Sequence, residues 1–81
     1  MDDLKYIIVD DFWPVIFHPT LVHADIYRGV SRNGRCTGAG FVRRDALGNY
    51  ACFGESISLN IKSQPDDSKI VNRFFNPDYN G

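Results

Sequence analysis

Apolar residues occupy consecutive positions near the start of the chain, in the segment Leu4–Asp10. In an extended backbone Tyr6 and Ile8 point to one side and Ile7 and Val9 to the other, because successive side chains alternate. β-branched and aromatic residues favour strands, and a strand that is apolar on both faces is covered on both sides. The segment is therefore predicted to be a central strand.

A turn and a returning strand are expected next. Residues 10–14 read DDFWP, and acidic residues followed by a proline are typical of a turn. The apolar residues Val15–Phe17 then form a short second strand. Residues 20–29 are ambiguous, because Leu21, Val22, Asp25 and Ile26 have nearly helical spacing whereas Val22, Ala24 and Ile26 alternate. We predict a short helix there, with an extended segment as the alternative.

The segment Thr37–Ile61 is predicted to form two strands that fold back on each other through the loop Asp45–Asn49. In this register Val42 faces Cys52, and farther along Gly40 faces Gly54. One face then carries the apolar residues Phe41, Phe53, Ile57, Leu59 and Ile61, and the other carries the small residues Gly38, Gly40, Gly54, Ser56 and Ser58. A slip by one residue would mix the two sets, so the pattern itself supports the register.

The last element is predicted to be a helix that begins after Ser63. Ser63 and Asp66 have the spacing of a capping box, and Pro65 suits the first turn. Ile70, Val71, Phe74 and Phe75 make one apolar stripe, and Asn76-Pro77 ends the helix. Because this stripe needs an apolar partner, we expect the helix to pack on the phenylalanine face of the hairpin. The glycine and serine face would then be left for a binding partner.

These elements predict an α+β fold, with an antiparallel sheet of about four strands and one C-terminal helix packed on one face. The chain has 81 residues, 43% of them hydrophobic and 14% aromatic, which predicts a single domain over residues 1–81. The formal net charge is −1, so the chain as a whole has no electrostatic attraction to nucleic acid or anionic membranes. Without a transmembrane run or a signal peptide, a cytoplasmic protein is expected.

No catalytic, cofactor or metal site is predicted. His18, His23 and Asp25 do not have the spacing of a common zinc site. Cys36 and Cys52 are roughly 20 Å apart in the predicted register, at about 3.3 Å per residue. A disulfide requires Cα atoms within about 7 Å of each other, so both cysteines are predicted to be free thiols.

Glu55 is the charged residue with the most costly predicted position, since the register places it on the apolar face. A bulge at Gly54 would turn Glu55 outward, and a pairing arginine, Arg35 or Arg43, would compensate its charge. A small acid–base enzyme that uses Glu55 together with His23 is one alternative function.

Nucleic-acid binding is another alternative. Five arginines lie in one stretch, at Arg28, Arg32, Arg35, Arg43 and Arg44, and aromatic residues accompany them. Arginines interleaved with aromatic residues suit single-stranded nucleic acids. The many aspartates remove any net positive charge, so this alternative is not favoured.

Three groups of residues resemble a family of small uncharacterised proteins from bacteriophages and prophages. These groups are Ala39-Gly40-Phe41, then Gly54-Glu55-Ser56-Ile57-Ser58-Leu59, and then Ser63, Pro65, Asp67 and Ile70. The opening Tyr6-Ile7-Ile8-Val9 and the later His23-Ala24-Asp25 are similar too. The resemblance implies no chemistry. It implies a phage protein, and with it a host system on which the protein acts.

The sequence therefore predicts a non-enzymatic phage-type protein that binds a host protein, such as a defence nuclease complex that it would inhibit, or that self-associates as a homodimer through sheet edges. No membrane partner is expected. The candidate partner-binding residues are Gly38, Gly40, Gly54, Ser56, Ser58, Trp13, Tyr27, Arg32 and Arg35. Aromatic residues and arginine dominate binding hot spots, which is the reason for including the last four.

Overall fold

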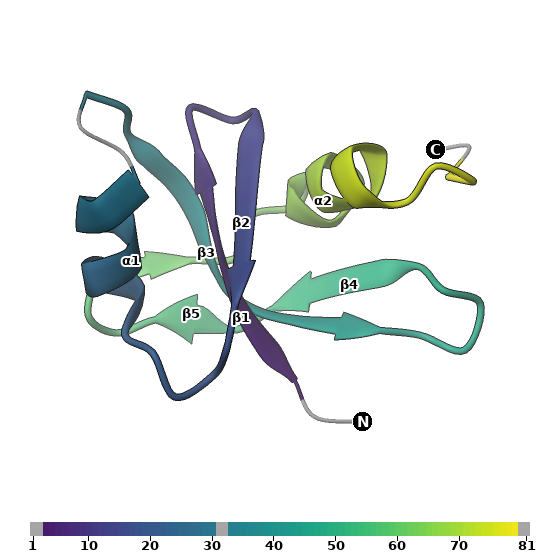
Figure 1. The fold of residues 1–81 in the computed structure, drawn as a ribbon, viewed down its shortest axis with the longest axis horizontal. Coiled ribbons are helices and arrows are strands. Elements are labelled where there is room, and N and C mark those ends of the chain that lie inside the picture. The colour runs from purple at the N-terminus through teal and green to yellow at the C-terminus, as the bar shows by residue number, and fades with distance from the viewer. Residues whose placement is uncertain (1–2, 31–32, 80–81) are drawn as a thin grey trace.

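Four strands form one antiparallel sheet in the order β2-β1-β3-β4 (Figure 1). The structure is a computed structural model and describes residues 3–30 and 33–79. The strands are β1 (Leu4–Val9), β2 (Trp13–Phe17), β3 (Cys36–Arg44) and β4 (Tyr50–Phe53). β1 is central and has four fully or nearly fully buried residues in a row, as its apolar pattern predicts.

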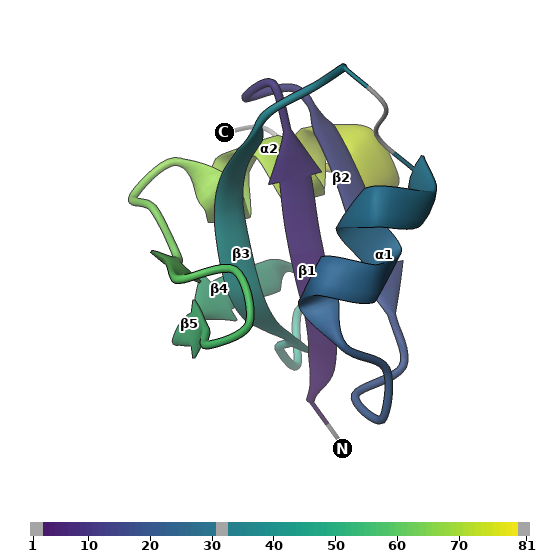
Figure 2. The ribbon, with the colours of Figure 1, turned by 90° about the vertical axis from the view of Figure 1, so that its left-hand side faces the viewer.

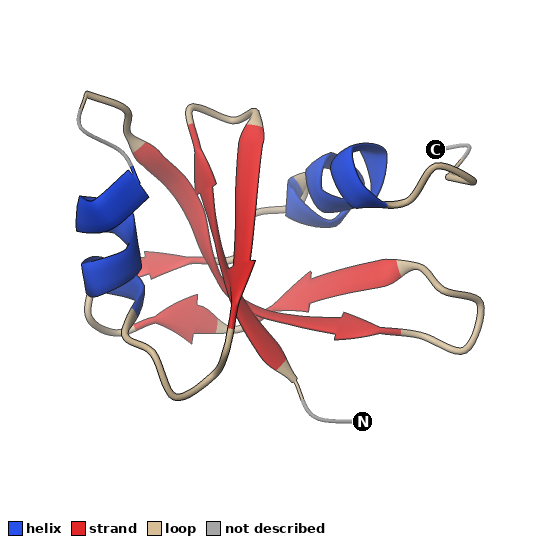
Figure 3. Ribbon diagram, viewed as in Figure 1, coloured by secondary structure: helices blue, strands red, loops and turns tan. Residues whose placement is uncertain are grey.

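Two helices and a small second sheet cover the main sheet. They are α1 (His23–Val30), α2 (Asp67–Phe75) and the two-stranded sheet of β5 (Glu55–Ser56) and β6 (Ile61–Lys62). Helix α1 and β5 lie in front of the sheet in Figure 2, and α2 lies behind it. Figure 3 shows the same arrangement with helices and strands in separate colours. The α+β prediction is confirmed, and so is the helix within residues 20–29.

The predicted register of the central hairpin is confirmed as far as Phe53. Four pairs run from Arg44–Tyr50 to Phe41–Phe53. The predicted pairs beyond Phe53 are wrong, because Gly54 adopts a left-handed φ of 77° and the next two residues pair with β6 instead. A Cβ atom at Gly40 would lie 2.5 Å from the Phe53 carbonyl oxygen, so this departure from the sheet requires glycine at position 40.

The predicted face for the C-terminal helix is wrong. Helix α2 packs on the side of Gly38 and Gly40, where Val71 joins a core made of Tyr6, Ile8 and Val42. Ile8 pairs with Gly38 and Tyr6 with Gly40, so the large side chains of β1 occupy the space beside the two glycines. The apolar partner of the helix is thus supplied by β1, and the hairpin side chains alone give no sign of it.

The opposite side of the sheet has its own core, formed by Ile7, Val9, Phe17 and Ala39. Ile26 and Tyr27 of α1 pack against it, as do Leu59 and Ile61 from the segment around β6. This face therefore holds part of the apolar set that the register predicted. Neither helix of the described chain is long and apolar enough to cross a lipid bilayer.

Side chains of α2 occupy the outer edge of β4. Asn72 Oδ1 accepts a 2.8 Å hydrogen bond from the Tyr50 N–H, and Asn72 Nδ2 donates to the Tyr50 carbonyl. Ser68 Oγ accepts from the Cys52 N–H, also at 2.8 Å. At the other edge, β2 contains Pro14, which has no N–H to offer a further strand. The α2 side chains therefore occupy two donors of β4 that a further strand could otherwise use, and Pro14 removes one N–H from β2.

The start of α2 differs from the predicted capping box. Asp66 makes no side-chain cap. Instead Asp67, which is 3% exposed, reaches back to accept from the Gln64 N–H at 2.9 Å. The Tyr6 hydroxyl donates to Asp67 Oδ2 at 2.6 Å and lies 2.9 Å from Ser63 Oγ. Burial raises the pKa of the Asp67 carboxyl, and its hydrogen bonds oppose this rise. The helix start is thus fixed to the central strand by a buried polar cluster.

Candidate functional site

The clearest candidate site is an apolar groove beside β4, with a volume of about 610 Å³. Four apolar side chains line it, Val22, Phe41, Phe53 and Ile57, together with Lys5, His23, Gly54, Glu55 and Ser58. Val22, Phe53 and Ile57 are exposed, and Ile57 keeps 89% of its surface accessible. Open apolar grooves with a few polar groups at the margin are typical binding sites.

The floor of the groove forms where the chain leaves the sheet at Gly54. Residues 57–60 then make a tight return in which Asn60 has a φ of 55° and its N–H donates to the Ile57 carbonyl. Ser56 Oγ accepts from the Leu59 N–H, and Ser58 Oγ accepts from the Ala24 N–H, both at 3.2 Å. The second bond joins this loop to the first turn of α1, which closes one end of the groove.

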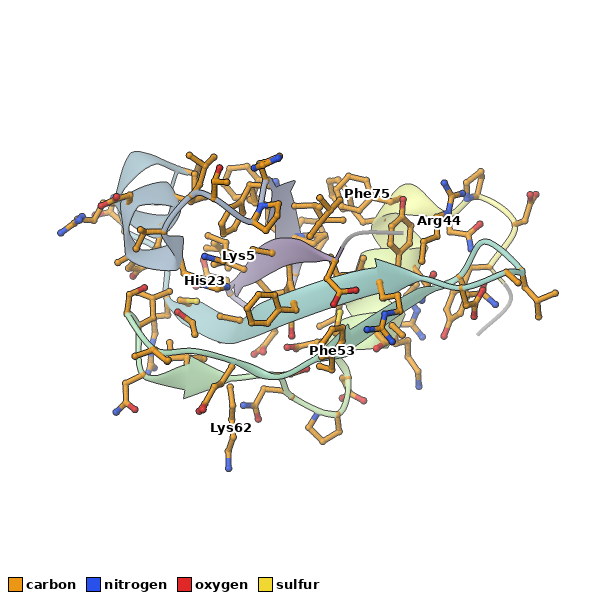
Figure 4. All side chains as sticks on the ribbon, turned by 90° about the horizontal axis from the view of Figure 1, so that it is seen from below. Lys5, His23, Arg44, Phe53, Lys62 and Phe75 are labelled. Carbon is orange, nitrogen blue, oxygen red and sulfur yellow. The ribbon has the colours of Figure 1, made fainter. Side chains whose placement is uncertain are left out.

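His23 forms the inner wall of the groove. Its Nε2 lies 2.8 Å from the Gly40 carbonyl oxygen, which can only accept, so Nε2 carries the proton in the neutral ring. The ring packs edge-on against Phe17 and Phe41, with centroids 5.4 and 6.0 Å away. Burial lowers the pKa of His23, and Lys5 adds to the effect. Figure 4 shows Lys5 and His23 near each other where α1 meets the sheet.

Protonation of His23 is expected to destabilise the fold. In the unfolded chain the imidazole has a pKa of about 6.5, and in the folded chain its pKa is lower. The free energy of unfolding is therefore highest above pH 6.5, where His23 is neutral in both states. It falls as the pH drops toward the pKa of His23 in the folded chain, by up to about 1.4 kcal/mol per pH unit. Urea unfolding between pH 5 and 8 should show this slope in the wild type and in His18→Gln. It should be lost in His23→Gln, and an unchanged slope in that variant would contradict this role.

The structure does not bring the eight described partner-binding candidates to one surface. Gly54 and Ser58 line the groove. Gly38, Gly40 and Ser56 are buried beneath the surface, and Ser56 is 1% exposed.

The remaining predicted residues lie elsewhere. Trp13 begins β2 and is partly exposed, and the exposed Arg35 precedes β3. Tyr27 is half-buried, and its hydroxyl donates to the Gly34 carbonyl at 2.6 Å. Arg32 falls outside the described residues. The apolar members of the groove were missed as site residues, because their periodicity resembles that of a core face.

Glu55 does not take the costly buried position. The left-handed Gly54 turns the chain, and Glu55 is exposed at the margin of the groove. The structure therefore agrees with the outward alternative for this residue. Glu55 and His23 do line the same groove, as the acid–base alternative requires. The Nε2 atom of His23 is already bonded to Gly40, however, and the whole residue is only 4% exposed.

The described arginines of the predicted stretch are spread over the molecule, and Arg28, Arg43 and Arg44 are bound to neighbours. Arg28 pairs with Asp25 within α1, and Arg43 pairs with Asp3 at 2.9 Å. Arg43 and Arg44 also stack over aromatic rings, Phe53 at 5.1 Å and Tyr50 at 5.3 Å. Helix α1 and the tip of the β3–β4 hairpin lie at opposite ends of the molecule in Figure 1, so these arginines do not form one basic surface.

The two cysteines are half-buried free thiols. Burial raises the pKa of Cys36, and it raises the pKa of Cys52 to about 11. A thiol whose pKa is raised carries little thiolate at neutral pH and is a poor nucleophile. Over residues 3–30 and 33–79 no group of three or more histidine, cysteine or acidic residues is arranged to hold a metal ion.

Comparison of the chain with protein-family models, with curated proteins and with solved structures finds no match. The assignment of a function therefore depends on the geometry of the groove, and the resemblance to phage proteins stays a prediction.

Proposed function

We propose that this protein is a small non-enzymatic binding module that takes an apolar side chain of a partner protein into the groove beside β4. The observation that carries the proposal is the convergence of Val22, Phe53 and Ile57, all exposed, around one cavity of about 610 Å³. Exposed apolar residues that occur singly need no explanation, whereas a cluster that surrounds a cavity is typical of an interaction site.

The polar groups around the groove support binding rather than catalysis. His23 and Ser58 have structural partners, at Gly40 and Ala24, and are thereby occupied in holding the groove. Lys5 Nζ donates to the Leu21 carbonyl at 2.8 Å and has two further protons to donate. Lys5 can therefore donate to an acceptor of the partner, and Glu55 can accept from a donor of the partner. The two bonds would orient the partner's apolar side chain in the groove.

The kind of partner is proposed from the resemblance to phage and prophage proteins. Such a protein acts in the cytoplasm of a bacterial host cell, and its partner is a host protein. A defence nuclease complex that the module would inhibit is the specific target proposed here. A small binding module blocks such a complex by covering a surface that the complex needs, with no chemistry of its own.

Capture from a bacterial host lysate tests this function. We expect the wild type to retain a specific protein and Ile57→Asp to retain at least tenfold less, because a charge at this position must be desolvated in the interface. Leu47→Asp is the matched control, since Leu47 is 87% exposed and lies at the β3–β4 hairpin tip, outside the groove. Equal capture by the two variants, or capture of nothing by the wild type, would contradict the proposal.

The nucleic-acid alternative has little geometric support, because Arg28 and Arg43 are engaged by Asp25 and Asp3. The acid–base alternative has one observation in its favour, the shared groove of Glu55 and His23. It is distinguished from binding by His23→Gln, which would abolish catalysis but only weaken capture of the partner, since glutamine can still donate to the Gly40 carbonyl although it does not replace the ring in the groove wall.

A further inference from the structure

A second exposed apolar surface lies on the other side of the sheet, between α2 and the β1–β2 turn. Phe12 is 72% exposed and Phe74 is 50% exposed. Together with Asp11, Ile70 and Arg73 they line a cavity of about 300 Å³. We call these five residues the Phe12 surface. It shares no residue with the groove beside β4.

The turn that presents Phe12 is a tight hairpin turn between β1 and β2 with two left-handed residues. Asp10 and Asp11 have φ values of 56° and 57°, a left-handed region that costs an L-residue roughly 1–2 kcal/mol. The Phe12 N–H donates to the Val9 carbonyl at 3.1 Å, which closes the turn. Paired left-handed residues of this kind form the tight turn of a β-hairpin, and aspartate tolerates this conformation better than most side chains do.

Contacts with Arg35, just before β3, and with Thr37 of β3 hold this turn in place. The Asp10 N–H donates to the Arg35 carbonyl at 2.8 Å, and Asp10 Oδ1 accepts from the Arg35 N–H at 2.9 Å. The Asp11 N–H donates to Thr37 Oγ1 at 2.9 Å. Three hydrogen bonds thus fix the turn whose next residue is a phenylalanine exposed to solvent. The backbone that carries Phe12 is therefore already ordered, which lowers the conformational entropy that binding would cost.

The Phe12 surface combines features that a second copy of the same surface could match. It presents a protruding ring and a cavity side by side, and its margin carries one acid and one base, Asp11 and Arg73. The ion pairs of the described part of the chain involve other residues, so neither charge has an ion-pair partner there. We propose that a second copy of this chain docks on this surface by two-fold symmetry. Phe12 of each copy then enters the cavity of the other, and Asp11 of each faces Arg73 of the other. A two-fold contact requires a self-complementary patch of this kind.

The size of the surface predicts a weak dimer. With about 200 Å² for each phenylalanine, the exposed aromatic area is roughly 250 Å² per copy. This is well below the area of a standard interface, so a dissociation constant on the order of 100 µM is expected. The dimer also leaves the groove beside β4 free on both copies, so dimerisation and capture of a host protein can be tested separately.

Sedimentation equilibrium of the full chain between about 10 µM and 1 mM tests this proposal. We expect a monomer–dimer equilibrium in the wild type, and at least tenfold weaker association in Phe12→Ser. Ile57→Ser, in the other apolar site, should associate like the wild type. Phe12 is largely exposed, so its replacement should not unfold the chain, and circular dichroism checks this.

Reciprocal charge reversal tests the two-fold geometry itself. Asp11→Lys alone and Arg73→Glu alone should each be monomeric, because like charges then face each other twice. An equimolar mixture of the two variants should form a heterodimer, because both contacts regain opposite charges. A wild type that stays monomeric at about 1 mM, or a Phe12→Ser variant that associates normally, would overturn the proposal. So would a mixture that stays monomeric although each variant folds.

Discussion

Replacing Gly38 with alanine is expected to lower the free energy of unfolding by about 3 kcal/mol. A Cβ atom at this position would lie less than 3.0 Å from both carboxyl oxygens and the carboxyl carbon of Asp67. Asp67 cannot move away freely, because its carboxylate holds the Tyr6 hydroxyl and the Gln64 N–H. The alanine therefore forces apart β3 and the start of α2. Urea unfolding followed by circular dichroism measures the loss.

Two comparisons make this prediction specific. Gly29→Ala is the matched control, because nothing lies within 4 Å of a Cβ atom there and α1 should gain roughly 0.5–1 kcal/mol. In an Asp67→Ala background, Gly38→Ala should cost at least about 2 kcal/mol less, since the colliding carboxylate is gone. Equal costs in both backgrounds would show that the collision is not the cause.

Asn72→Ala is expected to cost a similar amount, about 3 kcal/mol. Asn72 is 2% exposed and bonds both backbone groups of Tyr50, and its Nδ2 also donates to the Ser68 carbonyl. Alanine leaves the N–H and the carbonyl of Tyr50 unpaired beneath α2, and each such group costs about 1–3 kcal/mol. The same urea titration measures the effect.

Two other substitutions in α2 provide reference values for the loss of unfolding free energy in Asn72→Ala. Ser68→Ala removes one bond, to the Cys52 N–H, so about 1 kcal/mol is expected. Lys69→Ala changes an exposed position of the same helix and should stay within about 0.5 kcal/mol of the wild type. An Asn72→Ala variant as stable as Lys69→Ala would refute the role of α2 in covering the edge of β4.

Local patterns in the sequence predicted the elements well. The apolar run of β1, the hairpin register through Phe53 and the apolar stripe of α2 are each encoded by neighbouring residues, so they could be found without the fold. The strand order and the helix face depend on β1, whose Tyr6 and Ile8 occupy the side on which the hairpin is bare. The residue pattern of the β3–β4 hairpin alone therefore predicts neither the strand order nor the face on which α2 packs.

The candidate site was predictable only in part, because its contacts join residues far apart in the sequence. Ser58 seemed to belong to a bare surface, but its hydroxyl accepts from the Ala24 N–H of α1. Gly38 seemed free for a partner, but its missing side chain leaves room for Asp67. Ile57 was assigned to the core face by its position in the strand pattern, and the left-handed Gly54 places it in solvent instead.

The most direct test of the central claim, that the groove beside β4 is the docking site, is hydrogen–deuterium exchange of the module with and without the captured host protein. We expect slower exchange at the backbone amides of residues 22–24 and 53–59 in the complex. The hairpin tip, residues 45–49, should exchange at the same rate in both states. Protection at the tip, or on α2 alone, with residues 53–59 unchanged, would contradict it.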